Sequence, residues 1–446
     1  MRWGAANREV LVLMHRISYL SCALFLLGAW SSMASAESGE VTLSGQTMGT
    51  TYTVKAFLPK TTDRNAIGEA IVEELEEINT RMSTYLPDSE VSRFNRAAPG
   101  EWFEVSGATA QVVQLAQQIS TRTEGAFDIT VNPLVELWGF GPAARRREQG
   151  DVGPPTDAEI AAVLERVGFT KLDVSLKPPR LRKQVEGLQI DLSAIAKGYA
   201  VDRIWHVLND WGGIQSYMIE VGGEVRVRDA KPNGEAWSIA IESPLVDVRK
   251  PELILAARNT AIASSGDYRN FFEHEGVLYS HTIDPRTGRP VSHPASGVTV
   301  TTERCAEADA LATALMVLGP AAGQDWCEAN QVAALFLSRT DEGVLRGQSS
   351  HFDMPEWTAT APVAEEEGQL VPTILVAILV FGLVIVAMSV GVLVQGKRLQ
   401  GSCGGLAGMK DSQGRTICDA CTNPSPLCSG QAEAESDEET AVSSEP

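Results

Sequence analysis

The longest apolar stretch of the chain runs from Leu370 to Val394 and contains no charged residue. A helix of this length spans a hydrocarbon core of about 30 Å. Three glutamates, residues 365–367, precede the stretch, whereas Lys397 and Arg398 follow it. Because basic flanks tend to stay in the cytoplasm, the pattern predicts one membrane crossing, with the long N-terminal part outside and a short tail inside. The alternative is a buried core helix of unusual length.

A second apolar run, from Ile17 to Trp30, follows three arginines within the first sixteen residues. The small residues Ala-Ser-Ala at 34–36 then offer a cleavage site. Residues 1–36 are therefore typical of a secretory signal peptide. An uncleaved signal anchor is the main alternative, and a lipid anchor on Cys22 is a weaker one. What remains outside the membrane is a domain at residues 37–360 and an acidic linker at 361–369.

Helical and extended patterns follow one another irregularly within residues 37–360. Segments with a period near 3.6 indicate helices, and segments rich in β-branched and aromatic residues indicate strands. The predicted helices are Ile67–Met82, Thr109–Thr121 and Asp157–Val167. The predicted strands are Glu40–Phe57, Leu188–Leu192, Tyr217–Val227 and Trp237–Ile241. Since regular βαβ units and nucleotide-binding glycine loops are missing, we expect one large α+β domain rather than a doubly wound sheet.

The formal net charge of −20 argues against nucleic acid as a partner, because nucleic-acid binding needs basic surfaces. Residues 431–446 carry part of the negative charge and are typical of a solvated, disordered tail. Cys305 and Cys327 in the outer domain could form a disulfide or remain small buried thiols.

Four cysteines crowd into residues 395–430, behind the predicted membrane helix: Cys403, Cys418, Cys421 and Cys428. In a reducing compartment such a cluster favours iron or zinc over disulfides. Unliganded thiols or transient redox chemistry are the alternatives. The spacing matches no standard zinc ribbon or ferredoxin, so the metal stays open.

Two short segments combine polar residues in ways that suggest chemistry on phosphates. Asp309 and Thr313 are four residues apart, so on a helix both face the same side, and their oxygens suit Mg²⁺. The alternative is a helix-end carboxylate and a hydroxyl bonded back to the helix backbone. Lys197 follows Asp191 and a small-residue turn into a helix, an arrangement that suits a phosphate, although an ordinary strand-to-helix connection looks the same.

A third segment places His281 beside the turn Asp-Pro-Arg-Thr-Gly at residues 284–288. The backbone is fixed in such a turn, and a histidine there could act as a general base near neutral pH. A purely structural histidine is the alternative.

Eight motifs occur in an order that resembles one family. They are QTMGTTY, MSTYLPDSEVSRFN, GAFDITV, DLSAIAKGYAVD, VGGE, SGDYRNFF, HTIDPRTGRP and CAEADALATAL. Together they resemble the bacterial FAD:protein FMN transferases of the ApbE family, from about Val41 to Phe336. The resemblance implies an enzyme that cuts FAD at its pyrophosphate, attaches FMN to a threonine of a partner protein and releases AMP.

The resemblance also implies roles for individual residues. His281 would accept the proton of the threonine. Mg²⁺ would be bound by Asp309, Thr313 and the backbone carbonyl of Ala194. The turn Ser193-Ala194 is often glycine-rich in the family, so a positive φ there would strain Ala194. The residues expected to bind FAD are Met48, Tyr85, Ala126, Phe127, Asp128, Asp191, Lys197 and Ile283.

The tail carries a second resemblance, beginning at Ser402-Cys403-Gly-Gly. It is similar to NqrM, the maturation protein of the sodium-translocating NADH:quinone reductase, which is implicated in iron supply. The fusion implies a protein of the bacterial inner membrane with a periplasmic transferase domain and a cytoplasmic tail, and its expected partners are the bilayer and flavin-acceptor subunits of a redox complex. The alternatives are a FAD pyrophosphatase and a non-catalytic flavin-binding scaffold.

Overall fold

The computed structural model describes residues 38–141, 153–245, 250–267 and 271–355. The predicted signal peptide, linker, membrane helix, Cys-rich segment and acidic tail all lie outside these ranges, and so do the four tail cysteines. In the part of the chain that is described, no helix is both long and apolar enough to cross a bilayer.

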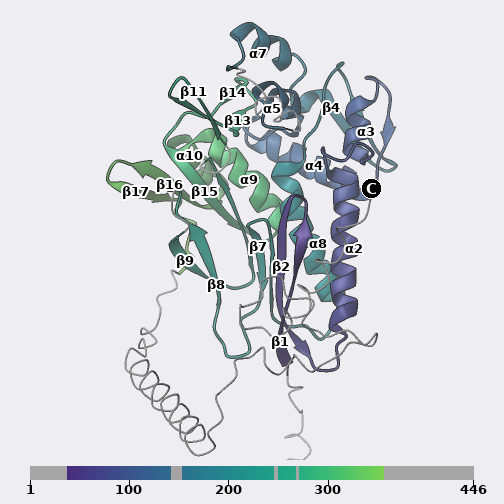
Figure 1. Cartoon of the computed structure of the whole chain (residues 1–446), viewed down its shortest axis with the longest axis vertical. Coiled ribbons are helices and arrows are strands. Elements are labelled where there is room, and N and C mark those ends of the chain that lie inside the picture. Colours follow the sequence, from purple (N-terminus) through teal and green to yellow (C-terminus); the bar gives the residue numbers. More distant parts are fainter. Residues whose placement is uncertain (1–37, 142–152, 246–249, 268–270, 356–446) are drawn as a thin grey trace, which may run out of the picture. The chain divides into compact units, whose positions relative to one another are not determined.

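An eight-stranded sheet forms the centre of the described structure (Figure 1). Every neighbouring pair in it is antiparallel. The expectation of an α+β fold rather than a parallel, doubly wound sheet is therefore confirmed. In sheet order the strands are β1 (Ser38–Thr47), β2 (Thr50–Pro59), β6 (Tyr217–Val221), β7 (Glu224–Arg228), β10 (Thr260–Gly266), β15 (Ala295–Thr302), β16 (Ala333–Thr340) and β17 (Gly343–Gln348).

Two predicted strands prove to be hairpins. The segment Glu40–Phe57 folds back at Met48 and Gly49, whose φ values of 48° and 74° make the tight turn between β1 and β2. The segment Tyr217–Val227 folds back in the same way at Gly222 and Gly223. In Tyr217–Val227 the apolar alternation continues through the turn, so the pattern alone does not mark the reversal there.

Helices cover one face of the sheet. The large core lies between this face and the helices α2 (Arg64–Met82), α4 (Gly107–Arg122), α8 (Ser193–Trp211), α9 (Cys305–Leu318) and α10 (Pro320–Asn330). Helices α2 and α4 confirm two predictions. Helix α2 buries an apolar residue every three or four positions, and Asp63 caps its first turn by accepting from two backbone amides. The described Cys305 and Cys327 are buried free thiols, so the disulfide alternative is not realised.

The opposite face of the sheet packs against a separate hairpin, β8 (Trp237–Glu242) and β9 (Pro251–Ala257), around a second core. Strand β8 confirms the prediction Trp237–Ile241. A third, smaller core joins α5 (Asn132–Trp138), α7 (Asp157–Leu164) and the strand pair β13 (Ile283–Asp284) and β14 (Arg289–Pro290). Helix α7 is shorter than predicted because it ends at Leu164 rather than Val167.

The remaining elements are short. They are α3 (Glu90–Arg96), the hairpin β11 (Phe271–His274) and β12 (Val277–Ser280), the 3₁₀ turns η1 (Ile129–Val131) and η3 (Phe169–Lys171), and the small sheet β3 (Phe103–Glu104), β5 (Pro179–Lys183) and β4 (Leu172–Leu176). The predicted strand Leu188–Leu192 is wrong, because this segment joins none of the described sheets.

Candidate active site

Helices α8 and α9 touch at Gly198. A methyl group at this position would lie 2.3 Å from the carbonyl oxygen of Cys305, so the close approach requires glycine. The Gly198 amide donates to Oδ2 of Asp309 at 2.9 Å. One turn later on α8, Asp202 accepts from the amides of Cys305 and Ala306 at 2.9 and 3.0 Å. The two helices therefore run antiparallel, with paired positions in register.

Lys197, Glu224 and Asp309 form a charged cluster beside this crossing. Nζ of Lys197 lies 3.2 Å from Oε1 of Glu224 and 3.6 Å from Oδ1 of Asp309. Both carboxylates are buried, whereas the Lys197 side chain is 27% exposed. Burial alone would lower the pKa of Lys197, but the charges of Asp309 and Glu224 raise it above its ordinary value. Lys197 is thus a fixed positive charge that can face an anion.

The predicted magnesium ligands come from this same pair of helices. Thr313 lies one turn beyond Asp309 on α9, and Ala194 lies one turn before Gly198 on α8. Because the helices are antiparallel, Ala194 comes level with Asp309 and Thr313. Ala194 already belongs to α8 and is not among the residues with positive φ, so the anticipated strain is not present.

These three positions offer a carboxylate, a hydroxyl and a carbonyl oxygen, the donor types that Mg²⁺ prefers. Oδ1 of Asp309 has only the distant Lys197 contact, while Oδ2 is held by the Gly198 amide. The donor set therefore fits the ion. Within the described residues, no group of three or more His, Cys, Asp or Glu side chains is arranged to hold a metal.

The hairpin turns of the sheet approach the same cluster. A methyl group at Gly222 would lie 3.1 Å from Cδ of Lys197 and 2.8 Å from Cγ2 of Thr50. Thr50 begins β2, two residues after Met48, so the turn that carries Met48 reaches the side of Lys197. Glu224 begins β7 directly after the other turn. The motifs that contain Met48 and Glu224 therefore meet beside Lys197.

Asp191 and Tyr85 lie close to each other at the start of α8. Partial burial and the nearby charge of Asp191 raise the pKa of the Tyr85 phenol, whose residue is 69% exposed. The Asp191 carboxylate accepts from the Ser193 amide at 2.8 Å. The backbone amide of Asp191 donates to the carbonyl of Ile129 at 2.7 Å. An exposed aromatic ring beside a carboxylate suits a stacked ring with a polar edge.

The segment Ala126–Asp128 is placed beside Asp191 by that Ile129 contact. Ala126, Phe127 and Asp128 are buried. Asp128 accepts from the amides of Thr130 and Phe169 at 2.8 and 2.7 Å, while burial raises the pKa of its carboxyl. Because the Asp128 carboxylate makes these hydrogen bonds within the protein, it stabilises the conformation of its own segment.

His281 and Ile283 lie on the side of the third core. Ile283 is buried and pairs with Pro290. The His281 ring meets the Phe140 ring edge-on at 6.3 Å. The turn that follows Ile283 lies close to the start of the segment Ala126–Asp128, since a methyl group at Gly125 would lie 3.8 Å from Cγ of Arg286. The role of His281 as a base stays a prediction.

Glu224 is the site residue that the sequence did not single out. It belongs to the motif VGGE, yet nothing local distinguishes it from a surface glutamate after a glycine turn. In the structure it is 3% exposed, bonded to Lys197, and its Oε2 has no hydrogen-bond partner among the described residues. A charged residue directly after a glycine turn inside a strand pattern was the available signal.

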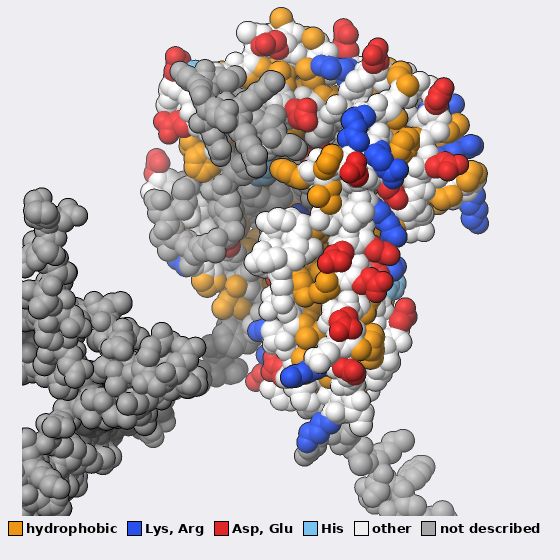
Figure 2. All heavy atoms as spheres, turned by 45° about the vertical axis from the view of Figure 1, so that its right-hand side comes forward, with side chains coloured by type: hydrophobic (Ala, Val, Ile, Leu, Met, Phe, Trp, Pro, Cys, Tyr) orange, Lys and Arg blue, Asp and Glu red, His pale blue; other side chains and the backbone are white. Residues whose placement is uncertain are grey.

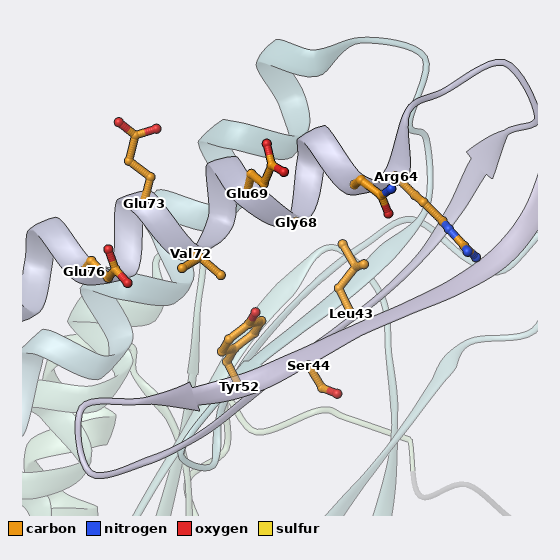
Figure 3. A pocket seen from close by; sticks show the side chains of 10 residues that line it. Leu43, Ser44, Tyr52, Arg64, Gly68, Glu69, Val72, Glu73 and Glu76 are labelled. Atoms are coloured by element: carbon orange, nitrogen blue, oxygen red, sulfur yellow. The ribbon is translucent and has the colours of Figure 1, made fainter. Parts of the chain in front are cut away.

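A separate groove of about 560 Å³ lies between α2 and the β1–β2 hairpin (Figure 3). Leu43, Tyr52 and Val72 supply its apolar walls, and glutamates of α2 line its rim. Figure 2 shows acidic side chains gathered beside hydrophobic ones over the lower part of this face. None of the predicted site residues lines this groove.

Comparisons with known proteins agree with the eight motifs. A family model described as the ApbE family matches residues 48–336, and one described as (Na+)-NQR maturation NqrM matches residues 392–440. The FAD:protein FMN transferase of Vibrio cholerae is 46% identical over 70% of this chain and 92% of its own length. That of Escherichia coli K12 is 34% identical over 76% and 96%.

Solved structures show the same likeness. The flavin transferase ApbE of Vibrio cholerae has a TM-score of 0.64 at 45% identity, covering 71% of this chain and 98% of that one. The apo flavinyl transferase ApbE of Pseudomonas stutzeri has a TM-score of 0.64 at 36% identity, covering 72% and 98%. The chain therefore belongs to the ApbE family of FAD:protein FMN transferases and carries an NqrM-like segment near its C-terminal end.

Proposed function

We propose that this chain transfers FMN from FAD to a threonine of a partner protein and releases AMP. The observation that carries the proposal is the cluster at the α8–α9 crossing, where Nζ of Lys197 lies 3.6 Å from Oδ1 of Asp309 and Thr313 follows one helical turn after Asp309. A pyrophosphate needs both a fixed cation and a magnesium site to hold it. The Tyr85 ring lies near Asp191, six residues before Lys197 in the chain, where an attached ring system of FAD is within reach.

In the transfer, the threonine oxygen forms a bond to the flavin-side phosphorus while the bond from that phosphorus to the AMP oxygen breaks. His281 takes the threonine proton, and AMP leaves with the electron pair of the broken bond. Lys197 orients the phosphates by its charge, and Glu224 and Asp309 fix the position of Lys197. Asp309, Thr313 and the Ala194 carbonyl would hold Mg²⁺, which would supply neutralisation of the negative charge that develops.

The acceptor class follows from the second segment of the chain. An NqrM-like segment in the same polypeptide supports subunits of a sodium-translocating NADH:quinone reductase, or a related redox complex, as acceptors. We place the transferase domain in the periplasm, residues 370–394 in the inner membrane and the cysteines in the cytoplasm, where they assist iron supply. The charge asymmetry around residues 370–394 supports this orientation.

A mass measurement tests the proposal. The full-length chain in detergent is mixed with FAD, Mg²⁺ and a reductase subunit that bears an acceptor threonine, and the subunit is then weighed and mapped. We expect one FMN on a threonine, lost in Asp309→Ala and on chelation of Mg²⁺, but retained in Asp341→Ala, an exposed turn residue. Free FMN with an unmodified subunit would favour the pyrophosphatase. No FAD cleavage at all would favour the non-catalytic scaffold.

A further inference from the structure

The segment Leu188–Asp191 has the alternation of a strand but pairs with no strand of the described residues. Leu188 and Ile190 are fully buried, yet no described sheet includes them. A buried backbone must still satisfy its polar groups. The side chain of Asn95 does this for Ile190: Oδ1 accepts from the Ile190 amide at 2.8 Å, and Nδ2 donates to the Ile190 carbonyl at 2.9 Å. The carboxamide thus replaces a neighbouring peptide group.

A buried lysine reinforces this arrangement. Lys183 is 2% exposed, and its Nζ donates to the carbonyls of Asn95 at 2.9 Å and Leu188 at 3.2 Å. It also lies 5.4 Å from the centre of the Phe94 ring. An ammonium buried against two carbonyls joins the end of α3 to the start of the segment. Replacing it would leave both carbonyls without a donor inside the protein.

The N-terminal end of α3 holds the loop that carries Tyr85. Hydroxyls of Ser89 and Ser92 donate to the carbonyl of Ser83 at 2.6 and 3.3 Å. The Tyr85 amide in turn donates to the Ser83 hydroxyl at 3.2 Å. One helix of seven residues therefore contacts both the Tyr85 loop and the segment that ends at Asp191.

We propose that Asn95 and Lys183 are positioning residues for FAD: they fix the Asp191 segment against the Tyr85 loop, and neither needs to touch the ligand. The inference rests on the proposed FAD site. Its physical basis is that each side chain satisfies buried backbone groups of the Asp191 segment, so its loss displaces the groups of that segment that face FAD. The isosteric change Asn95→Asp keeps the acceptor for the Ile190 amide and turns the donor into a second acceptor facing the Ile190 carbonyl.

The test measures the dissociation constant of FAD by flavin fluorescence, and KM and kcat for FMN transfer, with the full-length chain. At pH 8 we expect Asn95→Asp and Lys183→Met to weaken FAD binding and raise KM by about tenfold or more, with kcat within about threefold of the parent chain. On lowering the pH to about 5.5 the introduced carboxyl regains a proton to donate, so Asn95→Asp recovers and Lys183→Met does not.

Matched controls carry the same substitutions elsewhere. Asn233 uses its side-chain oxygen to accept from the Glu235 amide in an exposed turn, and Lys177 is exposed in the turn that joins β4 to β5, the strand that contains Lys183. Asn233→Asp and Lys177→Met should bind FAD like the parent chain. A lower unfolding temperature with unchanged FAD affinity, or a loss in Asn95→Asp that does not recover at low pH, would overturn the inference. FAD binding without transfer in the parent chain would instead refute the proposed function alone.

Discussion

Gly198→Ala should pull apart the two helices that carry the proposed phosphate site. The added methyl group would lie 2.3 Å from the Cys305 carbonyl oxygen and 2.8 Å from Cα of Ala306, where comfortable contact begins near 3.4 Å. The helices must therefore separate by about 1 Å. Overpacking against backbone costs about 3 kcal/mol at the upper end of its usual range, of which about 1 kcal/mol is offset by the helix preference of alanine.

The net cost is thus about 2 kcal/mol of unfolding free energy, measurable by urea titration. FMN transfer should fall about a hundredfold, because the Gly198 amide would no longer hold Oδ2 of Asp309. Gly68→Ala is the matched control within helix α2, since its methyl group would meet only Cδ2 of Leu43 at 3.9 Å. It should be neutral or more stable by up to about 1 kcal/mol, with unchanged transfer. A Gly198→Ala chain as stable and active as the control would refute the reasoning.

Two further predictions concern buried polar groups. Asp202→Asn should lower the unfolding free energy by about 3 kcal/mol, because Asp202 pairs with Arg226 at 2.7 Å and accepts from the first amide of α9. The control Asp173→Asn removes one charge of a more exposed pair, Asp173 with Arg182, and should cost under about 1 kcal/mol in the same urea titration. Burial and then the charge of Glu328 raise the pKa of Cys327 to about 12 from its ordinary 9.0, so its thiol should resist iodoacetamide at pH 8 until the chain is unfolded, as peptide mapping would show. The neutral thiol of Cys327 therefore contributes fully to the free energy of unfolding below about pH 9, and this contribution is lost as the pH rises towards 12. Rapid alkylation of native Cys327 would contradict this placement.

Local patterns were enough to predict some elements and misleading for others. Helix α2 was found because its buried residues keep the helical period over many turns. The hairpins at Met48 and Gly222 were read as single strands, since alternation shows which face is buried but not where the chain reverses. The segment Leu188–Leu192 has the local pattern of a strand. In the structure, the Ile190 amide instead donates to the side chain of Asn95, a residue far away in the sequence that the segment itself does not reveal.

The site divides in the same way. Asp309 and Thr313 could be paired from their spacing alone, because four residues make one helical turn. Lys197 was chosen for its place after a strand-like segment, and the structure adds the reason for its fixed charge, two carboxylates from other elements. Glu224 was missed because its contact with Lys197 joins residues far apart in sequence. Pattern identifies groups that share one element, whereas packing identifies groups that meet across elements.

This division has a functional consequence. Lys197 and Asp309 sit on long helices packed against the main core, so their positions depend on global stability. Tyr85 and Asp191 sit on connections whose positions are held by side chains of α3 and β5. Changes at the helix crossing should therefore lower stability and transfer together, whereas changes at Asn95 or Lys183 should weaken FAD binding first. In the proposed site, the phosphate end of FAD would therefore meet the helix crossing, and its ring end would meet the segments that α3 holds.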